Sequence, residues 1–210
     1  MGRRTAVLIS GSGSNLQALL DATTPPGSSA EIVLVLSNRT DAFGLERARR
    51  AGVPTLVIPH RDHPDRRSFD TAVDAALREA DVELVCLAGF MRLLTAPFVE
   101  AWRDRMLNIH PSLLPAFRGL HAQAQALAAG ARAAGCTVHF VRPEMDTGPI
   151  VVQGVVPIRQ DDDEASLTAR ILEVEHRCYP LALDLVASGR AQIVDERVVI
   201  DGAQVELLLR

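Results

Sequence analysis

The run MLNIHP at residues 106–111 places an Asn and a His two positions apart at the end of a predicted strand. Successive side chains of a strand point to opposite faces, so Asn108 and His110 share one face while Ile109 points to the other. An amide donor beside an imidazole could stabilise an oxyanion and act as a general acid or base, which suits acyl or formyl transfer. The alternative is a core His and a turn-forming Asn that only satisfy backbone groups.

A carboxylate that could serve this pair is Asp146, in the run EMDTGP at residues 144–149. The run is predicted to be a loop between two strands, with Gly-Pro fixing a sharp turn just after the Asp. Placed against an imidazole, a carboxylate would favour the imidazolium or hold a water for proton transfer. The sequence leaves open whether Asp146 reaches His110 or only forms the turn.

A glycine-rich loop, SGSGSN at residues 10–15, lies between a predicted buried strand and a predicted helix. Backbone N–H groups and the helix dipole make an anion site at such a junction, and phosphate is the expected anion. The third glycine of the dinucleotide fingerprint is replaced by Leu16, and the second strand ends in SNR (residues 37–39) without an acid. Both features argue against a nicotinamide cofactor. The alternative is a tight turn capped by Ser or Asn, with no ligand.

Two further groups have the residue types of metal sites but simpler interpretations. The acidic run at residues 161–163 is expected to cap a long helix and interact with its dipole, rather than to bind magnesium. His60 and His63 have a metal-like H-x-x-H spacing, but they lie on a polar loop flanked by prolines. We therefore expect no metal at either group.

The composition excludes several classes of function. The chain has 210 residues, 48% of them hydrophobic and 23% charged, with a formal net charge of −4, which indicates one ordinary globular domain. The acidic balance argues against a protein that mainly neutralises nucleic-acid phosphates or a membrane surface. All 22 cationic residues are Arg, which excludes Schiff-base chemistry on a Lys and a P-loop. We expect Arg47, Arg49 and Arg50 to form a solvated helix face.

The spacing of the cysteines and the length of the apolar runs indicate the cellular compartment of the protein. Cys86, Cys136 and Cys178 lie far apart and form no C-x-x-C motif, so neither a disulfide framework nor a zinc site is predicted. No run approaches the roughly 18 apolar residues of a membrane span. We expect a cytoplasmic protein that binds neither membrane nor nucleic acid.

The elements that must position these residues alternate between strands and helices. This alternation predicts a parallel sheet with helices on both faces, and ligands of such sheets bind beyond the carboxyl ends of the strands. The tail at residues 192–209 alternates apolar and polar residues around Asp201-Gly202, which predicts a hairpin. Predicted strands span residues 5–9, 31–36, 55–58, 83–88, 106–109, 137–141 and 150–157. Predicted helices span residues 15–22, 41–51 and 64–80, and about 121–129 and 164–187.

Motifs along nearly the whole chain resemble the phosphoribosylglycinamide formyltransferases, folate-dependent enzymes of purine synthesis in the formyltransferase superfamily. The strongest segment is LNIHPSLLPAFRGLH at residues 107–121, whose SLLP run is typical of that superfamily. Further segments similar to the family follow in the right order: VLISGSGSNLQALL, SNRTDAFGLERAR, VCLAGFMRLL, TVHFV, MDTGPI, and EH at 175–176 before YP at 179–180.

The resemblance implies a Rossmann-like, doubly wound, mostly parallel α/β sheet with helices on both faces and a C-terminal hairpin. It implies a single formyltransferase domain over residues 1–210, with a phosphate-binding half at about 1–100 and a folate and catalytic half at about 101–210. The implied reaction moves the formyl group of the co-substrate 10-formyltetrahydrofolate to the amine of 5-phosphoribosylglycinamide, in de novo purine (IMP) synthesis. The products would be formylglycinamide ribonucleotide and tetrahydrofolate. No metal is implied, and a homodimer is left open.

The resemblance also assigns roles to individual residues of this chain. The catalytic trio would be Asn108, His110 and Asp146. The substrate's phosphate would bind Gly11, Ser12, Gly13, Ser14 and Asn15, and its sugar or amine would contact Glu175. The formyl-folate would bind Arg66, Met91, Arg92, Leu93, Leu94, Asn108, Val141 and Asp146. Arg67 could take the place of its neighbour, and no catalytic role is assigned to His121 or His139.

The chain departs from the family pattern at AFR (residues 116–118) and at Cys136. We expect that neither position touches the trio.

Other functions remain open, because relatives share the trio and it does not name the formyl acceptor. A methionyl-tRNA formyltransferase is expected to carry an additional basic C-terminal domain, and a formyltetrahydrofolate deformylase an additional N-terminal one, so we expect neither in 210 residues. A non-catalytic phosphate-binding module is the rival from another class.

Overall fold

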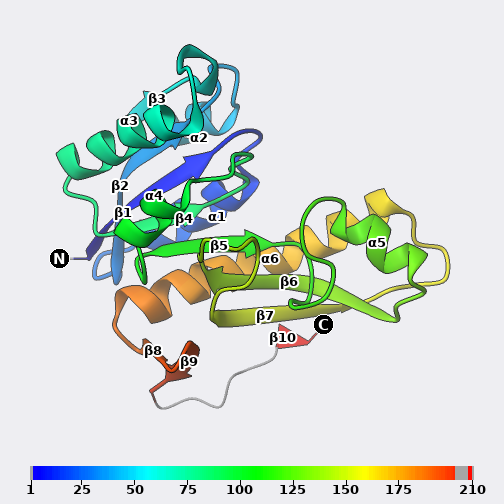
Figure 1. Ribbon diagram of the computed structural model, residues 1–210. Coiled ribbons are helices and arrows are strands. Elements are labelled where there is room, and N and C mark those ends of the chain that lie inside the picture. Colours follow the sequence, from blue (N-terminus) through cyan, green and yellow to red (C-terminus); the bar gives the residue numbers. More distant parts are fainter. Residues whose placement is uncertain (1, 202–207, 210) are drawn as a thin grey trace. The chain divides into compact units, whose positions relative to one another are not determined.

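The computed structural model describes residues 2–201 and 208–209, and the chain forms two compact units, which are described separately (Figure 1). Unit 1 comprises residues 1–108 and unit 2 comprises residues 109–210. The strand β5 (Met106–His110) runs across this boundary in the sequence. None of the helices within the described residues has the length and apolar character needed to cross a membrane.

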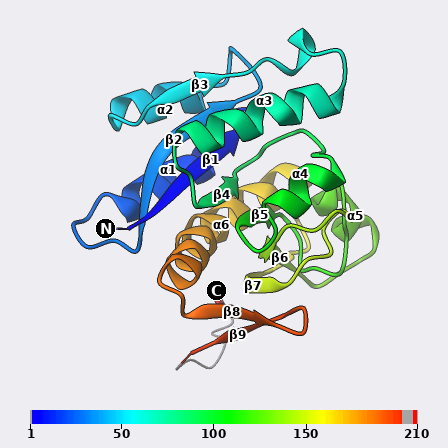
Figure 2. The same cartoon turned by 60° about the vertical axis from the view of Figure 1, so that its left-hand side comes forward.

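A parallel sheet forms the centre of unit 1. β1 pairs with β2 on one side and with β4 on the other, β3 lies beyond β2, and β5 lies beyond β4, all in parallel. Figures 1 and 2 show α1 and α3 on opposite faces of this sheet. The strands are β1 (Arg3–Ile9), β2 (Ala30–Ser37), β3 (Thr55–Val57) and β4 (Leu84–Leu87). The helices are α1 (Ser14–Thr23), α2 (Gly44–Arg50), the 3-10 turn η1 (His60–Asp62), α3 (Arg66–Glu79) and α4 (Ala96–Ala101).

The apolar strand β1 has helices over both of its faces, and its burial shows this. The four residues Ala6, Val7, Leu8 and Ile9 are completely buried, as a central strand of a parallel sheet should be. Three loops follow the carboxyl ends of β1, β2 and β4: the glycine loop, residues 38–43 and residues 88–95. Loops in these positions carry the ligand sites of parallel sheets, so the fold places the glycine loop where chemistry is expected.

Unit 2 is built on an antiparallel pair covered by one long helix. β6 (Ala133–Phe140) pairs antiparallel with β7 (Ile150–Pro157), and the 24-residue helix α6 (Glu164–Ala187) packs on this pair. The helix approaches closely because β7 has a Gly at position 154, where a Cβ would collide with Val174 of α6. The remaining elements are α5 (Ala122–Ala128), β8 (Ala191–Val194), β9 (Arg197–Ile200) and β10 (Leu208–Leu209).

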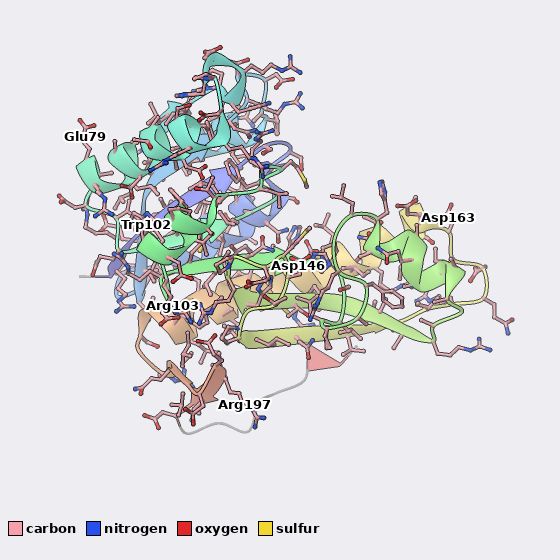
Figure 3. The ribbon with its side chains drawn as sticks, viewed as in Figure 1. Glu79, Trp102, Arg103, Asp146, Asp163 and Arg197 are labelled. Carbon is pink, nitrogen blue, oxygen red and sulfur yellow. The ribbon has the colours of Figure 1, made fainter. Side chains whose placement is uncertain are left out.

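The acidic run at residues 161–163 caps α6, as predicted. Asp163 accepts a 2.8 Å hydrogen bond from Ser166 N, and Ser166 Oγ accepts one from Asp163 N, which completes a capping box. Asp162 forms a two-bond ion pair with Arg170, both bonds at 2.7 Å, which lowers the pKa of its carboxyl. Figure 3 shows Asp163 at the start of α6 and Arg197 on the hairpin that follows the helix.

The predicted α/β class, with a mostly parallel sheet and a C-terminal hairpin, is confirmed, but the position of the hairpin turn is wrong. β8 and β9 pair through Val194 and Arg197, so the turn is Asp195-Glu196. Of the predicted turn Asp201-Gly202, Gly202 lies outside the described residues. Leu208–Leu209 pairs in parallel with β7, so this end of the tail does not return along β9. Sequence patterns also missed η1 and α4, which are only 3 and 6 residues long.

Candidate active site

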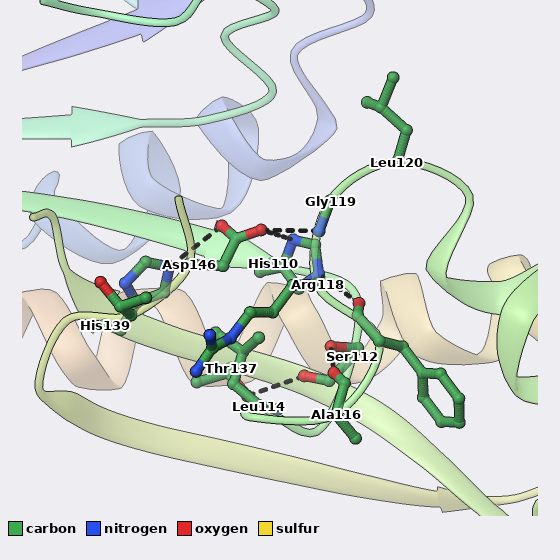
Figure 4. A network of polar contacts seen from close by, with 12 residues as sticks. His110, Ser112, Leu114, Ala116, Arg118, Gly119, Leu120, Thr137, His139 and Asp146 are labelled. Carbon is green, nitrogen blue, oxygen red and sulfur yellow. Dashed lines mark hydrogen bonds and ion pairs between the residues drawn. The ribbon is translucent and has the colours of Figure 1, made fainter. Parts of the chain in front are cut away.

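His110 ends β5 with both ring nitrogens directed at oxygen atoms (Figure 4). Its Nε2 lies 3.0 Å from the carbonyl oxygen of Phe117, and its Nδ1 lies 3.5 Å from Oδ2 of Asp146. A carbonyl oxygen only accepts hydrogen bonds, so Nε2 is the donor in that contact. The side chain is 8% exposed. The structure thus brings His110 and Asp146 together. The Asp146 carboxylate lies beside Nδ1, the nitrogen of the buried imidazole that would carry a second proton.

The Asp146 carboxylate accepts one backbone hydrogen bond and has an imidazole on each side. Its Oδ2 accepts a 2.9 Å hydrogen bond from the backbone N–H of Gly119, and its Oδ1 lies 3.8 Å from Nε2 of His139. The backbone of Asp146 has φ of 56°, the left-handed conformation that Asp adopts more readily than most residues. The carboxylate therefore lies between two imidazoles and is fixed by the Gly119 N–H, with only 8% of its side chain exposed.

The sequence assigns no role to His139, although this residue is the His of the TVHFV motif at residues 137–141. Its Nδ1 lies 2.9 Å from the carbonyl oxygen of Phe140, so Nδ1 donates and Nε2 carries the lone pair. Burial lowers the pKa of this imidazole, against the smaller opposing effects of the Phe140 carbonyl and Asp146. His139 is thus a neutral group facing the Asp146 carboxylate. His121 is different: it is an exposed residue at the start of α5.

The loop at residues 111–119 is anchored to β6 and β7 (Figure 4). Thr137 Oγ1 donates to the carbonyl oxygen of Ser112 at 2.7 Å and accepts from Leu114 N at 3.1 Å, and Gln153 Nε2 donates to Leu114 O at 2.9 Å. The expectation that residues 116–118 do not touch the trio is wrong, because the carbonyl of Phe117 contacts His110. That contact uses the backbone, so it does not depend on which side chain stands at position 117. Cys136 is completely buried.

The glycine loop of unit 1 opens α1 without a side-chain cap. Gly13 is the N-cap, with φ of 70°, and no Ser or Asn side chain accepts a hydrogen bond there, so the alternative of a Ser or Asn cap is wrong. A Cβ at Gly13 would also lie 2.6 Å from the Cα of Gly44 in α2, so the loop requires glycine on conformational and on steric grounds. The loop thus joins α1 in a left-handed conformation that presents backbone N–H groups at a helix start, the arrangement that binds anions.

A cation supports this loop. Arg47 donates from Nε to the carbonyl oxygen of Ser12 at 2.9 Å and from Nη1 to Gln17 at 3.3 Å. The prediction of a solvated face is therefore wrong for Arg47. It holds for Arg49 and Arg50, which are exposed and pair with Glu46.

Ser10 connects two loops of unit 1. Its buried hydroxyl donates to Oδ1 of Asn38 at 2.6 Å and accepts from the backbone N–H of Met91 at 2.8 Å. Asn38 Nδ2 in turn lies 3.1 Å from Nδ1 of His60, while the ring of His63 packs edge-on against Phe69. The two histidines of the H-x-x-H run thus have different partners, and no group of metal-ligating side chains occurs among the described residues.

The other predicted site residues fall in one unit or the other. In unit 1, Arg66 and Arg67 are exposed at the start of α3, Met91 and Leu93 are 70% and 57% exposed, and Arg92 and Leu94 are half-buried. Asn108 is half-buried in β5. In unit 2, Glu175 is buried in α6, and Val141 follows β6 directly. The substrate and folate roles of these residues stay predictions.

Comparisons with known proteins agree with this arrangement. The sequence profile of the formyl transferase family matches residues 3–183. The chain is 43% identical over 196 residues to the phosphoribosylglycinamide formyltransferase of Escherichia coli strain K12, covering 93% of this chain and 92% of that protein. It is 53% identical over 190 residues to the human trifunctional purine biosynthetic protein adenosine-3, which covers 90% of this chain. The chain spans only 19% of that relative's length, and 14% of its Drosophila melanogaster counterpart.

A solved structure gives the same result. The crystal structure of glycinamide ribonucleotide transformylase 1 from Symbiobacterium toebii superimposes with a TM-score of 0.92 at 51% identity, covering 95% of this chain and 94% of that one. The profile match extends over parts of both units and includes β5 with His110, the loop that carries Asp146 and the glycine-rich loop. On the profile match and on the identity to the Escherichia coli protein over nearly its whole length, this chain belongs to the formyl transferase family.

Proposed function

We propose that this protein transfers the formyl group of 10-formyltetrahydrofolate to the amine of 5-phosphoribosylglycinamide, giving formylglycinamide ribonucleotide and tetrahydrofolate in de novo purine synthesis. The observation that carries the proposal is the buried imidazole of His110 between the Phe117 carbonyl and the Asp146 carboxylate. The names of relatives that match this chain over most of their length support the choice of acceptor.

The reaction needs a group that stabilises negative charge and a group that moves a proton. The amine lone pair attacks the formyl carbon, and the carbonyl electron pair moves to oxygen to give a tetrahedral oxyanion. Asn108, two positions before His110 on β5, would donate its amide N–H to that oxygen, and the positive charge of the protonated imidazole would stabilise it further. Collapse of the intermediate re-forms the carbonyl and breaks the bond to N10 of the folate. The amine's proton passes to N10, and the product is the formamide.

Asp146 would sustain the imidazolium and order the water that relays this proton. The fixed position of its carboxylate, through Gly119 N–H, supports this role. Orientation of two bound substrates can be worth about 7–11 kcal/mol of the barrier in favourable cases, so positioning would account for much of the acceleration. The proposed steps use hydrogen-bond donors and a proton carrier of the chain, and none of them calls on a metal.

Binding would be divided between segments. The substrate's phosphate would bind the backbone N–H groups of residues 11–15, and Glu175 would contact its sugar or amine. The folate would bind Arg66, residues 91–94, Asn108 and the loop from Val141 to Asp146. Exposed apolar side chains in these segments support this assignment, since Met91 is 70% exposed and Met145 51% exposed.

The test is the absorbance change of 10-formyltetrahydrofolate with purified protein, with and without phosphoribosylglycinamide. A change that requires the ribonucleotide supports the transferase. Loss of the formyl group without it would identify a hydrolase, and no change in either cuvette would contradict the proposal. His110→Ala should abolish the signal, whereas Arg49→Ala, on an exposed helix face, should keep it.

A further inference from the structure

A buried Arg links the loop that carries Asp146 to the turn of the C-terminal hairpin. Arg142 donates from Nε to Oε2 of Glu196 at 2.7 Å, across 54 positions of sequence. The Arg142 side chain is 6% exposed, and the Glu196 side chain is 56% exposed. One end of this ion pair is therefore shielded from solvent, so its Coulomb attraction is screened less than that of a fully exposed pair.

Other contacts fix Arg142 to the same loop. Its Nη1 donates to the carbonyl oxygen of Val141 at 3.1 Å. Its stem lies against Gly148, where an added Cβ would be 3.2 Å from the Arg142 Cγ. Asp146 lies between these two contact points, so a fixed Arg142 restricts the loop on both sides of the carboxylate.

The hairpin turn has an unfavourable residue at the point of contact. Asp195 and Glu196 have φ of 50° and 56°, and as the two residues between paired Val194 and Arg197 they form a turn that favours Asn-Gly. Glu in the left-handed conformation costs free energy that Gly would avoid. A residue that carries such a cost in a tight turn indicates a use for its side chain, and the Arg142 ion pair is that use.

We propose that Glu196 is a positioning residue for the active-site loop at residues 141–148: through Arg142 it holds the loop in the conformation that presents Val141 and Asp146 to the formyl-folate. The proposal rests on the function proposed above. Glu196 would act through the Arg142 guanidinium that it binds, and not on the substrate or the reacting atoms.

The test compares Glu196→Gly, Arg142→Gln, the double variant and a matched control, Asp195→Asn, in the same turn. Glu196→Gly removes the carboxylate and relieves the backbone cost, so it should fold at least as well as the Arg142 variant. KM for 10-formyltetrahydrofolate, KM for phosphoribosylglycinamide and kcat are measured for each. Backbone hydrogen exchange of residues 141–149 is measured without substrate.

We expect each single variant to raise KM for the folate by about three- to tenfold, the range for a partly exposed charged hydrogen bond. KM for the ribonucleotide should not change, since its proposed phosphate site is in residues 11–15. The double variant should show no increase beyond that of Arg142→Gln, because that change alone already breaks the contact with Glu196. Exchange in residues 141–149 should become faster, and Asp195→Asn should behave as wild type.

An unchanged folate KM and unchanged exchange in Glu196→Gly would overturn the proposal. A reduced kcat with unchanged KM values for both substrates would indicate a loss of folded protein. That outcome would also overturn the proposal. If wild-type protein shows no formyl transfer, the proposed function fails, but the exchange comparison still decides whether Glu196 holds the loop.

Discussion

The backbone N–H of Gly119 donates a 2.9 Å hydrogen bond to Oδ2 of Asp146. The bond joins the loop before α5 to the loop between β6 and β7, and it acts on the same oxygen that faces His110 Nδ1. A backbone donor cannot rotate away as a side chain can, so the carboxylate keeps one orientation. The imidazole therefore has a fixed partner before any substrate binds, which is the preorganisation that electrostatic catalysis requires.

Asp146→Asn should reduce kcat/KM by about 10²- to 10⁴-fold, the usual contribution of a proton-transfer group. The amide can still accept the Gly119 hydrogen bond, but it carries no charge to support an imidazolium and cannot take up a proton. The pH profile of kcat/KM should be displaced as well. Asp81→Asn is the matched control, because Asp81 is exposed and has a similar backbone conformation, with φ of 49°. A wild-type profile in the Asp146 variant would remove this residue from proton handling.

Ser10→Ala should raise KM for 10-formyltetrahydrofolate and lower stability. The change leaves the Met91 N–H and the Asn38 Oδ1 without their shared partner, and a buried group left unsatisfied costs about 1–3 kcal/mol. For a protein of this size that lowers Tm by very roughly 2–12 °C. Thermal unfolding and folate kinetics check both effects. Ser28→Ala, at a surface turn where Ser28 Oγ bonds Pro25 O, should leave both unchanged. An unaltered folate KM would show that Met91 does not depend on Ser10.

Local patterns predicted most of the fold, because apolar periodicity and caps are local signals. Residues 164–187 were predicted as a helix, and α6 spans the same residues since Asp163 supplies the cap. The prediction of the hairpin turn failed because Asp-Gly is the stronger local signal. The turn at Asp195-Glu196 instead has a contact between Glu196 and Arg142 that no local pattern contains. The same holds for Gly119 and Asp146, which meet only through the tertiary structure.

The arginines of α2 cannot be told apart by helical phase. Arg47 is three positions after the buried Gly44, and Arg49 is four positions after the buried Leu45, so both lie beside buried residues of the helix. Arg47 differs from Arg49 in its contact with the carbonyl oxygen of Ser12, a tertiary contact that no local pattern contains.

Arg47→Ala should raise KM for phosphoribosylglycinamide by about three- to thirtyfold, the equivalent of roughly 0.7–2 kcal/mol for a lost charged hydrogen bond. The reason is indirect: Arg47 holds the carbonyl of Ser12 and so fixes the loop proposed to bind the phosphate. The folate KM should not change. Steady-state kinetics with each substrate varied in turn measure the difference, and Arg49→Ala on the same helix is the control. Equal effects of the two substitutions would point to general electrostatic attraction instead of loop positioning.

His139 should make the free energy of unfolding depend on pH below neutrality. Burial lowers its pKa in the folded protein below the ordinary 6.5, so between the two values the unfolded chain binds the proton and the folded protein does not. Stability from this group is therefore complete above about pH 6.5 and falls as the pH is lowered through that value, by at most about 1.4 kcal/mol per pH unit. Urea unfolding at pH 7, 6 and 5 should show a shallower dependence for His139→Gln than for wild type. His121→Gln, at an exposed position, should keep the wild-type slope. Parallel curves for wild type and His139→Gln would mean that His139 takes up its proton as easily in the folded protein as in the unfolded chain.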